Sequence, residues 1–479
     1  MTQERIYAVQ LKVNELSTLI NSSLPNIQEK TKIFKEVIDK AAQNATNINN
    51  EIKRIDRTQE RITLVLEKLK LAKEQKMIMT KCTEHFKTKD YENAIRSLNQ
   101  LKKYENDCSQ RTKEEMNIIE RTIKEEFVNM FTESTEKGDM KQILRYTDLL
   151  MRLGYQEEAL NQYINYYKSL ILNECTSLKE KLRALSMESI KSEAVFVATV
   201  KKYVEYVLTI ITRQSTIRAI DIFQSEKYFV MINELYNQVN SGVITLINEF
   251  MSIRRVKMIA EQRPAKDKEF PEHDCLMILD EIATFSNVII YYKKYIKDIL
   301  LTIPVHETFR KEQGKPNETQ LTLESELQKL LNYFLVLEKT YIQSYLMKSI
   351  QSRVKVSELG DVIDLFFFVL QQSIDRVILT NNHQTICAVI NEYVTLINNY
   401  FFKVISNSIS LSKGFGGNMP PEAVTYVEDC EKNIGRLYEL LNLKVGELFR
   451  DNSNILEMIQ TILDNLAESK NKFKIESFK

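Results

Sequence analysis

The sequence predicts an all-α protein, and three observations lead to this prediction. The 479 residues include only 10 glycines and 7 prolines, whereas average usage is about 7% and about 5%. So few turn-forming residues leave little room for β-hairpins or for the loops of parallel sheets. Apolar residues recur at the spacing of one helix face along most of the chain, and one stretch repeats in heptads. We therefore expect an N-terminal coiled-coil helix followed by a rod of stacked helical bundles.

Residues 1–80 are expected to form the N-terminal helices and the coiled coil. The first helix, over 1–24, has apolar residues in near-heptad spacing between Ile6 and Ile20, and we expect Pro25 to end it. The second helix runs from 27 to about 80 without a glycine or a proline. Near its middle, seven residues step alternately by four and three positions: Ile48, Ile52, Ile55, Gln59, Ile62, Leu66 and Leu69.

This seam is narrow, and charged residues such as Glu51, Arg54 and Arg61 flank it. A strict pattern of this kind favours a coiled coil with a partner helix. The alternative is a helix that packs against its own domain, as ordinary amphipathic helices do. In the coiled-coil interpretation, the single polar residue, Gln59, could fix the register of the helices.

Residues 81–262 are expected to form a helical bundle. Asp90 is a suitable N-cap for a helix whose apolar side contains Ala94, Leu98 and Leu101. A second helix follows, with apolar residues at Ile118, Ile119, Ile123, Phe127 and Phe131.

Two amphipathic helices on either side of Gly154 are the clearest local pattern in the chain. Gly154 follows a basic last turn, where a left-handed residue commonly ends a helix. Because the turn is short, we expect the two helices to fold back antiparallel and to share their apolar faces. Beyond them, helices should continue to 262, with weak breaks at Asp221 and at Ser241 and Gly242.

Prolines, glycines and charges divide the rest of the chain. A linker over 263–274 contains two prolines, and a second helical bundle is expected over 275–411. Within it we expect a helix with a stripe of Tyr291, Tyr292 and Tyr295, a loop over 304–320 and a helical pair over 321–412. A third linker over 412–421 leads to a terminal helical hairpin over 422–479, which is either a closing hairpin or the start of a truncated bundle.

Charge and cysteine content exclude several classes of protein. Lysine plus arginine number 66 against 65 for aspartate plus glutamate, so no net field favours nucleic acid or an anionic membrane. The first residues lack the apolar run of a signal peptide, and no stretch approaches the roughly 18 apolar residues of a membrane span. The cysteines are scattered without a CxxC pair, which indicates reduced cytosolic thiols: Cys82, Cys108, Cys175, Cys275, Cys387 and Cys430.

No catalytic residues, cofactor site or metal site are expected. Cys82 with His85, and His383 with Cys387, stand at helical spacing, but a zinc site needs three or four ligands. The glycine cluster at 414–417 lacks the Lys-Ser/Thr pair of a phosphate-binding loop. The basic stretch over 254–268 is expected to be a solvated helix end, with contact to anionic lipid or to an acidic partner as the alternative.

Several short motifs occur in the order found in a known family, and they are colinear over roughly residues 45–475. In this order they resemble subunit 4 of the conserved oligomeric Golgi complex. The motifs are Glu84-His85-Phe86, Lys89 to Ala94, Glu125-Glu126-Phe127, Glu136 to Asp139, Leu153 to Leu160, the segment 361–391, and Ala467 to Phe473.

The resemblance implies a non-enzymatic subunit of a multisubunit vesicle tether that supports intra-Golgi retrograde transport. Such a subunit assembles with other subunits through its N-terminal coiled coil and meets SNAREs, SM proteins and Rab GTPases. It is peripheral on the cytosolic face of the Golgi membrane, and its membrane association is indirect. Relative to the family, we expect this chain to lack an extended N-terminus and a C-terminal domain.

Other function classes remain as alternatives. A subunit of another tether such as exocyst, or a generic helical protein-interaction scaffold, would show the same helical pattern without catalytic motifs. A cytoskeletal coiled-coil protein is disfavoured because only about three heptads persist in the seam. An enzyme is disfavoured because no nucleophile is paired with a base.

Overall fold

The computed structural model describes residues 2–477 apart from 105, 107, 185–194, 217–218, 262–271, 352–358 and 413–420. Every regular element within these described residues is a helix, which confirms the all-α fold. The chain forms two compact units, Met1–Gly154 and Tyr155–Lys479. The four segments expected from the sequence differ from these two units, and that finer division stays a prediction.

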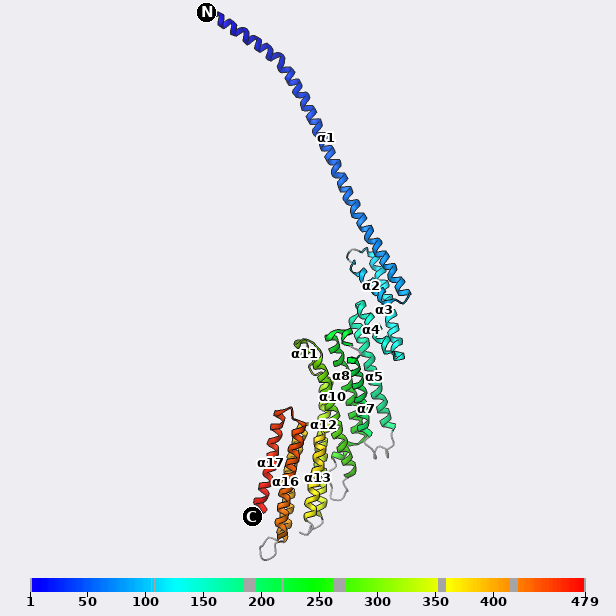
Figure 1. The fold of residues 1–479 in the computed structure, drawn as a ribbon, viewed down its shortest axis with the longest axis vertical. Helices are drawn as coiled ribbons and strands as arrows, with labels where there is room; N and C mark the ends of the chain where they lie inside the picture. The colour runs from blue at the N-terminus through cyan, green and yellow to red at the C-terminus, as the bar shows by residue number, and fades with distance from the viewer. Residues whose placement is uncertain are drawn as a thin grey trace. The chain divides into compact units, whose positions relative to one another are not determined.

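The first unit begins with α1, an unbroken helix over Thr2–Lys87 that contains Pro25. The expectation that Pro25 ends a first helix is therefore wrong. A proline inside a helix removes one backbone donor and bends the helix, and Figure 1 shows α1 bending within its N-terminal part. Just before the proline, the hydroxyls of Ser22 and Ser23 donate to the carbonyl of Leu19.

The last turns of α1 pack into a small bundle with α2 (Tyr91–Lys102), α3 (Gln110–Lys137) and α4 (Met140–Leu153). The expected cap of α2 is confirmed, because the side chain of Asp90 accepts a hydrogen bond from the backbone N–H of Asn93. Gly138 and Gly154 end α3 and α4 with φ of 67° and 106°. Glycine adopts this left-handed conformation most readily, and the helix end expected at Gly154 is confirmed.

The two helices on either side of Gly154 bury their stripes separately. α4 packs against α2 and α3 within the first unit. α5 (Gln156–Ala184) buries Tyr163, Tyr167 and Ile171 in the second unit, against α7 (Val195–Thr216) and α8 (Ala219–Ile253). The expected hairpin with shared apolar faces is wrong, because each stripe is covered by two other helices of its own unit.

The helices of the second unit stack in successive layers (Figure 1). α5, α7 and α8 form the first layer, α10 and α12 pack on it, α13 and α14 pack on those, and α16 and α17 pack on α13 and α14. The remaining elements are α9 (Val256–Glu261), α10 (Glu272–Thr302), α11 (Glu307–Gln313), α12 (Glu318–Gln351), α13 (Leu359–Leu379), α14 (His383–Leu396), η3 (Ile397–Phe401), α15 (Phe402–Ser412), α16 (Pro421–Leu448) and α17 (Ser453–Ser477).

Some expected loops and stripes differ from the structure. The loop over 304–320 contains α11, and 321–412 holds α12, α13, α14 and α15 rather than one helical pair. Tyr292 is buried in α10, whereas Tyr291 and Tyr295 are 59% and 41% exposed, so the three tyrosines do not form one buried stripe. The linkers over 263–274 and 412–421 lie mostly outside the described residues.

Two breaks were expected in the part of the chain that forms α8. The first, expected at Asp221, lies at Gln224, whose φ of 65° interrupts the helical backbone. The second is wrong, because α8 continues through Gly242. Glycine is required there for space, since a Cβ atom at this position would lie 1.9 Å from Oη of Tyr203.

Gly242→Ala is expected to destabilise the protein by about 1–3 kcal/mol, the usual cost of overpacking a core. The Tyr203 ring that the new methyl group would meet is fully buried. Gly435→Ala in α16 is the matched control, because a Cβ there meets nothing within 4 Å, and alanine favours a helix by about 1 kcal/mol over glycine. Chemical denaturation measures both changes. A Gly242→Ala variant as stable as the wild type would contradict the steric role.

Among the described residues, α10 has the length and apolar composition that would allow it to cross a membrane. This corrects the expectation that no stretch approaches a membrane span. Of its most apolar window, 56% is buried inside the structure, because α10 packs against α7, α8, α12 and α13. A helix that is surrounded by other helices is apolar on several sides, so its central position accounts for its composition.

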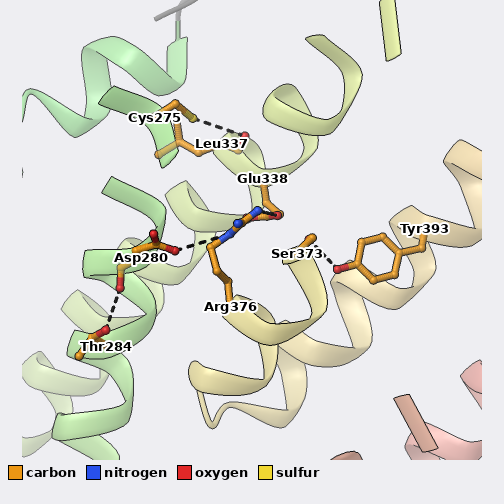
Figure 2. Close-up of polar contacts among 8 residues, drawn as sticks. All are labelled: Cys275, Asp280, Thr284, Leu337, Glu338, Ser373, Arg376 and Tyr393. Atoms are coloured by element: carbon orange, nitrogen blue, oxygen red, sulfur yellow. Dashed lines mark hydrogen bonds and ion pairs between the residues drawn. The ribbon is translucent and has the colours of Figure 1, made fainter. Parts of the chain in front are cut away.

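Two buried arginine–glutamate pairs join the layers of the second unit. Arg254, which follows α8, donates to both carboxylate oxygens of Glu281 in α10 at 2.8 and 2.7 Å. Arg376 in α13 donates to Glu338 in α12 at 3.3 and 2.7 Å and lies 3.9 Å from Asp280 in α10 (Figure 2). The two arginines and two glutamates are each less than one-tenth exposed, and pairing offsets the cost of burying their charges.

Candidate partner-binding site

Most of helix α1 lies outside the bundle that holds its last turns. Every residue from 2 to 70 is exposed, and the buried side chains of α1 begin at Gln75. At 1.5 Å per residue, the exposed part is about 100 Å long. This part of the molecule therefore offers a large surface to other chains.

The predicted seam lies on the exposed part of α1. Its six apolar side chains are between 50% and 61% exposed. Gln59 lies between Ile55 and Ile62 and lines a shallow hollow with them. Steps of four and three positions keep residues on one side of a helix, so the seven residues from Ile48 to Leu69 form one stripe. Their role in binding a partner helix stays a prediction.

An apolar stripe exposed along a helix is unfavourable in water. Fully burying one isoleucine or leucine gains roughly 1.5–3 kcal/mol. The six apolar seam residues are 50% to 61% exposed, so burial by a partner helix would add about half of that gain for each of them. Along the described residues 2–70, the ion pair present is that of Glu51 with Arg54 at 3.6 Å, which contributes a few tenths of a kcal/mol. Most helical stability in proteins comes from packing of the apolar face. Packing of this face against a partner helix would therefore make α1 more stable than exposure of the face to solvent.

Apolar residues upstream of the seam are exposed as well. Ile20, Ile27, Phe34 and Ile38 are each at least 50% exposed. The sequence-based prediction noted the near-heptad spacing from Ile6 to Ile20 but ended that helix at Pro25, and it did not include Ile27, Phe34 and Ile38 in the seam. The signal that identifies all four residues is their heptad spacing relative to Ile48.

The cysteines of the two cysteine–histidine pairs, Cys82 and Cys387, are both buried. Sγ of Cys82 donates to the carbonyl of Ala94 at 3.3 Å, and burial raises the pKa of this thiol to about 11. Nδ1 of His85 lies 3.5 Å from the carboxylate of Asp90. Burial also raises the pKa of Cys387. Among the described residues, no group of three or more potential ligands could hold a metal ion.

The basic stretch after α8 is partly a core feature. Arg254 is 7% exposed, binds Glu281, and lies with its guanidinium carbon 5.1 Å from the centre of the Phe196 ring. The expectation of a solvated helix end is therefore wrong at Arg254, because the arginine pairs with a buried carboxylate. Arg255 and Lys257 are exposed, and the basic residues from 262 to 268 lie outside the described residues.

Comparison with known families decides the identity of the chain. The family model of the COG4 transport protein, middle alpha-helical bundle, matches residues 145–409, which is more than half of the chain. The chain belongs to the family of subunit 4 of the conserved oligomeric Golgi complex. A second model, the N-terminal part of conserved oligomeric Golgi complex subunit 4, matches residues 13–117 and so includes the seam of α1.

Curated subunit 4 proteins from distant organisms are similar to this chain. The protein from Mus musculus is 18% identical over 419 residues, covering 81% of this chain and 53% of the relative. The Homo sapiens protein is 18% identical over 398 residues, with coverage of 77% and 50%, and the Arabidopsis thaliana protein is 18% identical over 381 residues, with coverage of 76% and 51%. The chain thus spans about half the length of the curated subunit 4 proteins it matches.

Among solved structures, a circular tandem repeat protein with novel repeat topology is similar over 84% of this chain and 97% of its own. The identity is 11% and the TM-score is 0.14. A likeness this low carries no argument about the fold of the subunit 4 family.

Proposed function

We propose that this chain is a non-enzymatic subunit of the conserved oligomeric Golgi complex and joins partner subunits through the seam of α1. Family membership supports the assignment to the complex. The mode of assembly rests on one observation: residues 2–70 of α1 are exposed throughout, and one side of this helix is apolar from Ile48 to Leu69. A long helix with such a face is suited to hold separate chains together.

The polar groups of the second unit support a scaffold rather than a catalyst. Oη of Tyr163 donates to Gln214 at 2.7 Å, which joins α5 to α7. The hydroxyls of Ser373 and Tyr393 lie 2.6 Å apart and join α13 to α14 (Figure 2). Buried networks whose members satisfy one another make helix packing specific and rigid. In the proposed role, these layers form a stiff support whose surface is available to other proteins.

The finer features of the role follow from the proposed membership of the complex. The chain would lie on the cytosolic face of the Golgi membrane, support intra-Golgi retrograde vesicle transport, and meet SNAREs, SM proteins and Rab GTPases. Its balance of 66 basic and 65 acidic residues supports attachment to the membrane through partners, because direct electrostatic attachment to anionic lipid uses clusters of basic residues.

Affinity purification of the full-length tagged chain from its own cells tests the proposal. We expect the other subunits of the conserved oligomeric Golgi complex to be recovered with it, identified by mass spectrometry and compared with an untagged control. Recovery of exocyst subunits in their place would assign the chain to the other tether. Recovery of the chain without any tether subunit would overturn the proposed function.

A further inference from the structure

One side of α13 keeps large apolar side chains in contact with solvent. α13 packs against α10, α12, α14 and α16, and these helices bury most of its apolar run from Leu365 to Leu370. Phe368 nevertheless stays 55% exposed, and Leu365, one turn before it, is 41% exposed. Among the phenylalanines of the second unit whose exposure the structure describes, Phe368 is the exposed one. Covering this side chain with a partner would gain free energy.

Phe368 borders an open groove between α13 and α16, which lie side by side (Figure 1). The groove has a volume of about 350 Å³. Its floor is apolar, because Phe367 and Leu437 are only 6% and 4% exposed. The full lining consists of Asp364, Phe367, Phe368 and Gln371 from α13, and of Asn433, Arg436, Leu437 and Leu440 from α16.

The lining residues stand at the same spacing on both helices. On α13 they begin at Asp364 and on α16 at Asn433, and from there each set follows the pattern i, i+3, i+4 and i+7. Residues at this spacing share one face of a helix. Seven residues of a helix rise by about 10 Å, and a helix that docks in a groove places its anchor residues over the same length. The groove therefore has the dimensions of a seat for a third helix.

Two contacts between α13 and α16 limit the groove along its length. Before it, Gly360 lies so close to the ring of Tyr426 that a Cβ atom on the glycine would be 3.4 Å from Cε1. Beyond it, Nζ of Lys444 lies 2.9 Å from Oδ1 of Asp375. Residue numbers rise from the first contact to the second on both helices, so α13 and α16 run parallel. The contacts are about 22 Å apart along α13, which limits a docked helix to about four turns.

The two walls of the groove carry opposite charges. Asp364 lies on the α13 wall and Arg436 on the α16 wall, and both are exposed. Within the described part of the chain, neither side chain forms an ion pair, in contrast to Lys444 and Asp375 one turn further on. Charges of this kind select partners by complementarity. A docked helix would meet Arg436 with a carboxylate and Asp364 with a lysine or an arginine.

We propose that the groove between α13 and α16 is a docking site for an amphipathic helix of another protein, two to four turns long. The helix places large apolar side chains at i, i+3 or i+4, and i+7 against Phe367, Phe368 and Leu437. Its acidic side faces Arg436 and its basic side faces Asp364. The inference goes beyond the proposed function, because it assigns a second partner-binding surface in the second unit and does not depend on the seam of α1.

Photocrosslinking of the full-length chain in its own cells tests whether the groove holds such a helix. A photoreactive benzophenone amino acid takes the place of Gln371, which lines the groove. The matched control has it in place of Gln372, which is also exposed but does not line the groove. We expect at least ten-fold more of one crosslinked protein from position 371, with the crosslink inside an amphipathic helix of the stated pattern. No excess over position 372, a crosslink to this chain itself, or a crosslinked segment without that pattern would overturn the inference.

Charge reversal tests the chemistry of the groove. Arg436→Glu is expected to lower the crosslink yield from position 371 at least ten-fold, whereas Arg436→Lys keeps most of it. Arg450→Glu is the matched control, since Arg450 is also exposed and follows α16 outside the groove. Replacing the acidic residue of the crosslinked helix by arginine should restore the yield with Arg436→Glu. An unchanged yield in Arg436→Glu would contradict the proposed chemistry, and recovery of tether subunits in the same samples reports on the proposed function separately.

Discussion

Leu66→Asp is expected to lower the recovery of partner subunits at least about 100-fold, whereas Leu64→Asp leaves it unchanged. Leu66 lies in the seam and is 52% exposed, and Leu64 lies outside the seam and is 53% exposed. A carboxylate in the seam must lose its water when a partner helix docks, which costs several kcal/mol. Each 1.4 kcal/mol or so is a factor of ten in affinity. Quantitative co-purification with the tagged full-length chain measures the difference.

The same pair of variants separates binding from folding. Both leucines are exposed in this chain, so neither substitution should change the helical content measured by circular dichroism or the stability of the second unit. Ile55→Asp is expected to behave as Leu66→Asp does, because Ile55 lies on the same stripe. Continued assembly of both seam variants would show that the coiled-coil interpretation is wrong.

Glu281→Leu is expected to destabilise the protein by about 3–5 kcal/mol, the usual cost of removing one member of a buried ion pair. The side chains of Arg254 and Glu281 are 4% and 1% exposed. Glu338→Leu removes the matching carboxylate of the second pair, and its loss is expected to be reduced by Asp280, which lies 3.9 Å from Arg376. Urea denaturation measures both variants. A Glu281→Leu variant as stable as the wild type would contradict a stabilising role for the carboxylate.

The double variant Arg254→Met with Glu281→Leu provides the control for this prediction. Replacing both members of a buried ion pair by apolar residues is often neutral or stabilising. The double variant is therefore expected to recover most of the stability lost in Glu281→Leu. A loss as large as that of the single variant would mean that the pair stabilises α8 against α10 by more than mutual charge compensation.

The helix ends were predictable where local chemistry determines them. Asp90 caps α2 through its own side chain, and Gly138 and Gly154 adopt left-handed conformations that other residues avoid. The errors arose at residues whose type is compatible with two different structural roles. Pro25 can end a helix or bend one, and Gly242 can break a helix or make room for Tyr203. Only the neighbours in space distinguish these cases.

The pairing of helices was less predictable than their positions. The stripes of α4 and α5 have the spacing that a hairpin requires, but any other amphipathic helix satisfies that spacing equally well. In the structure each stripe is covered within its own unit. The buried pairs of Arg254 with Glu281 and of Arg376 with Glu338 were also missed, because charged residues far apart in sequence carry no local sign of burial.

The candidate site was only partly visible in the sequence. The seven residues from Ile48 to Leu69 were found by their spacing, and the structure places them on one exposed face of α1. The near-heptad residues from Ile6 to Ile20 were found too, but they were assigned to a separate helix because Pro25 was expected to end it. Once α1 is continuous, the heptad count passes through the proline without a change of register.

Amide hydrogen exchange along α1 tests most directly the claim that this helix is the assembly element of the chain. In the isolated protein, amides between residues 6 and 69 are expected to exchange quickly, because no tertiary packing supports their helix. In the purified complex the same amides should be protected at least about 100-fold more, while the buried α10 is protected in both samples. Equal exchange of residues 6–69 in the isolated chain and in the complex would contradict the account.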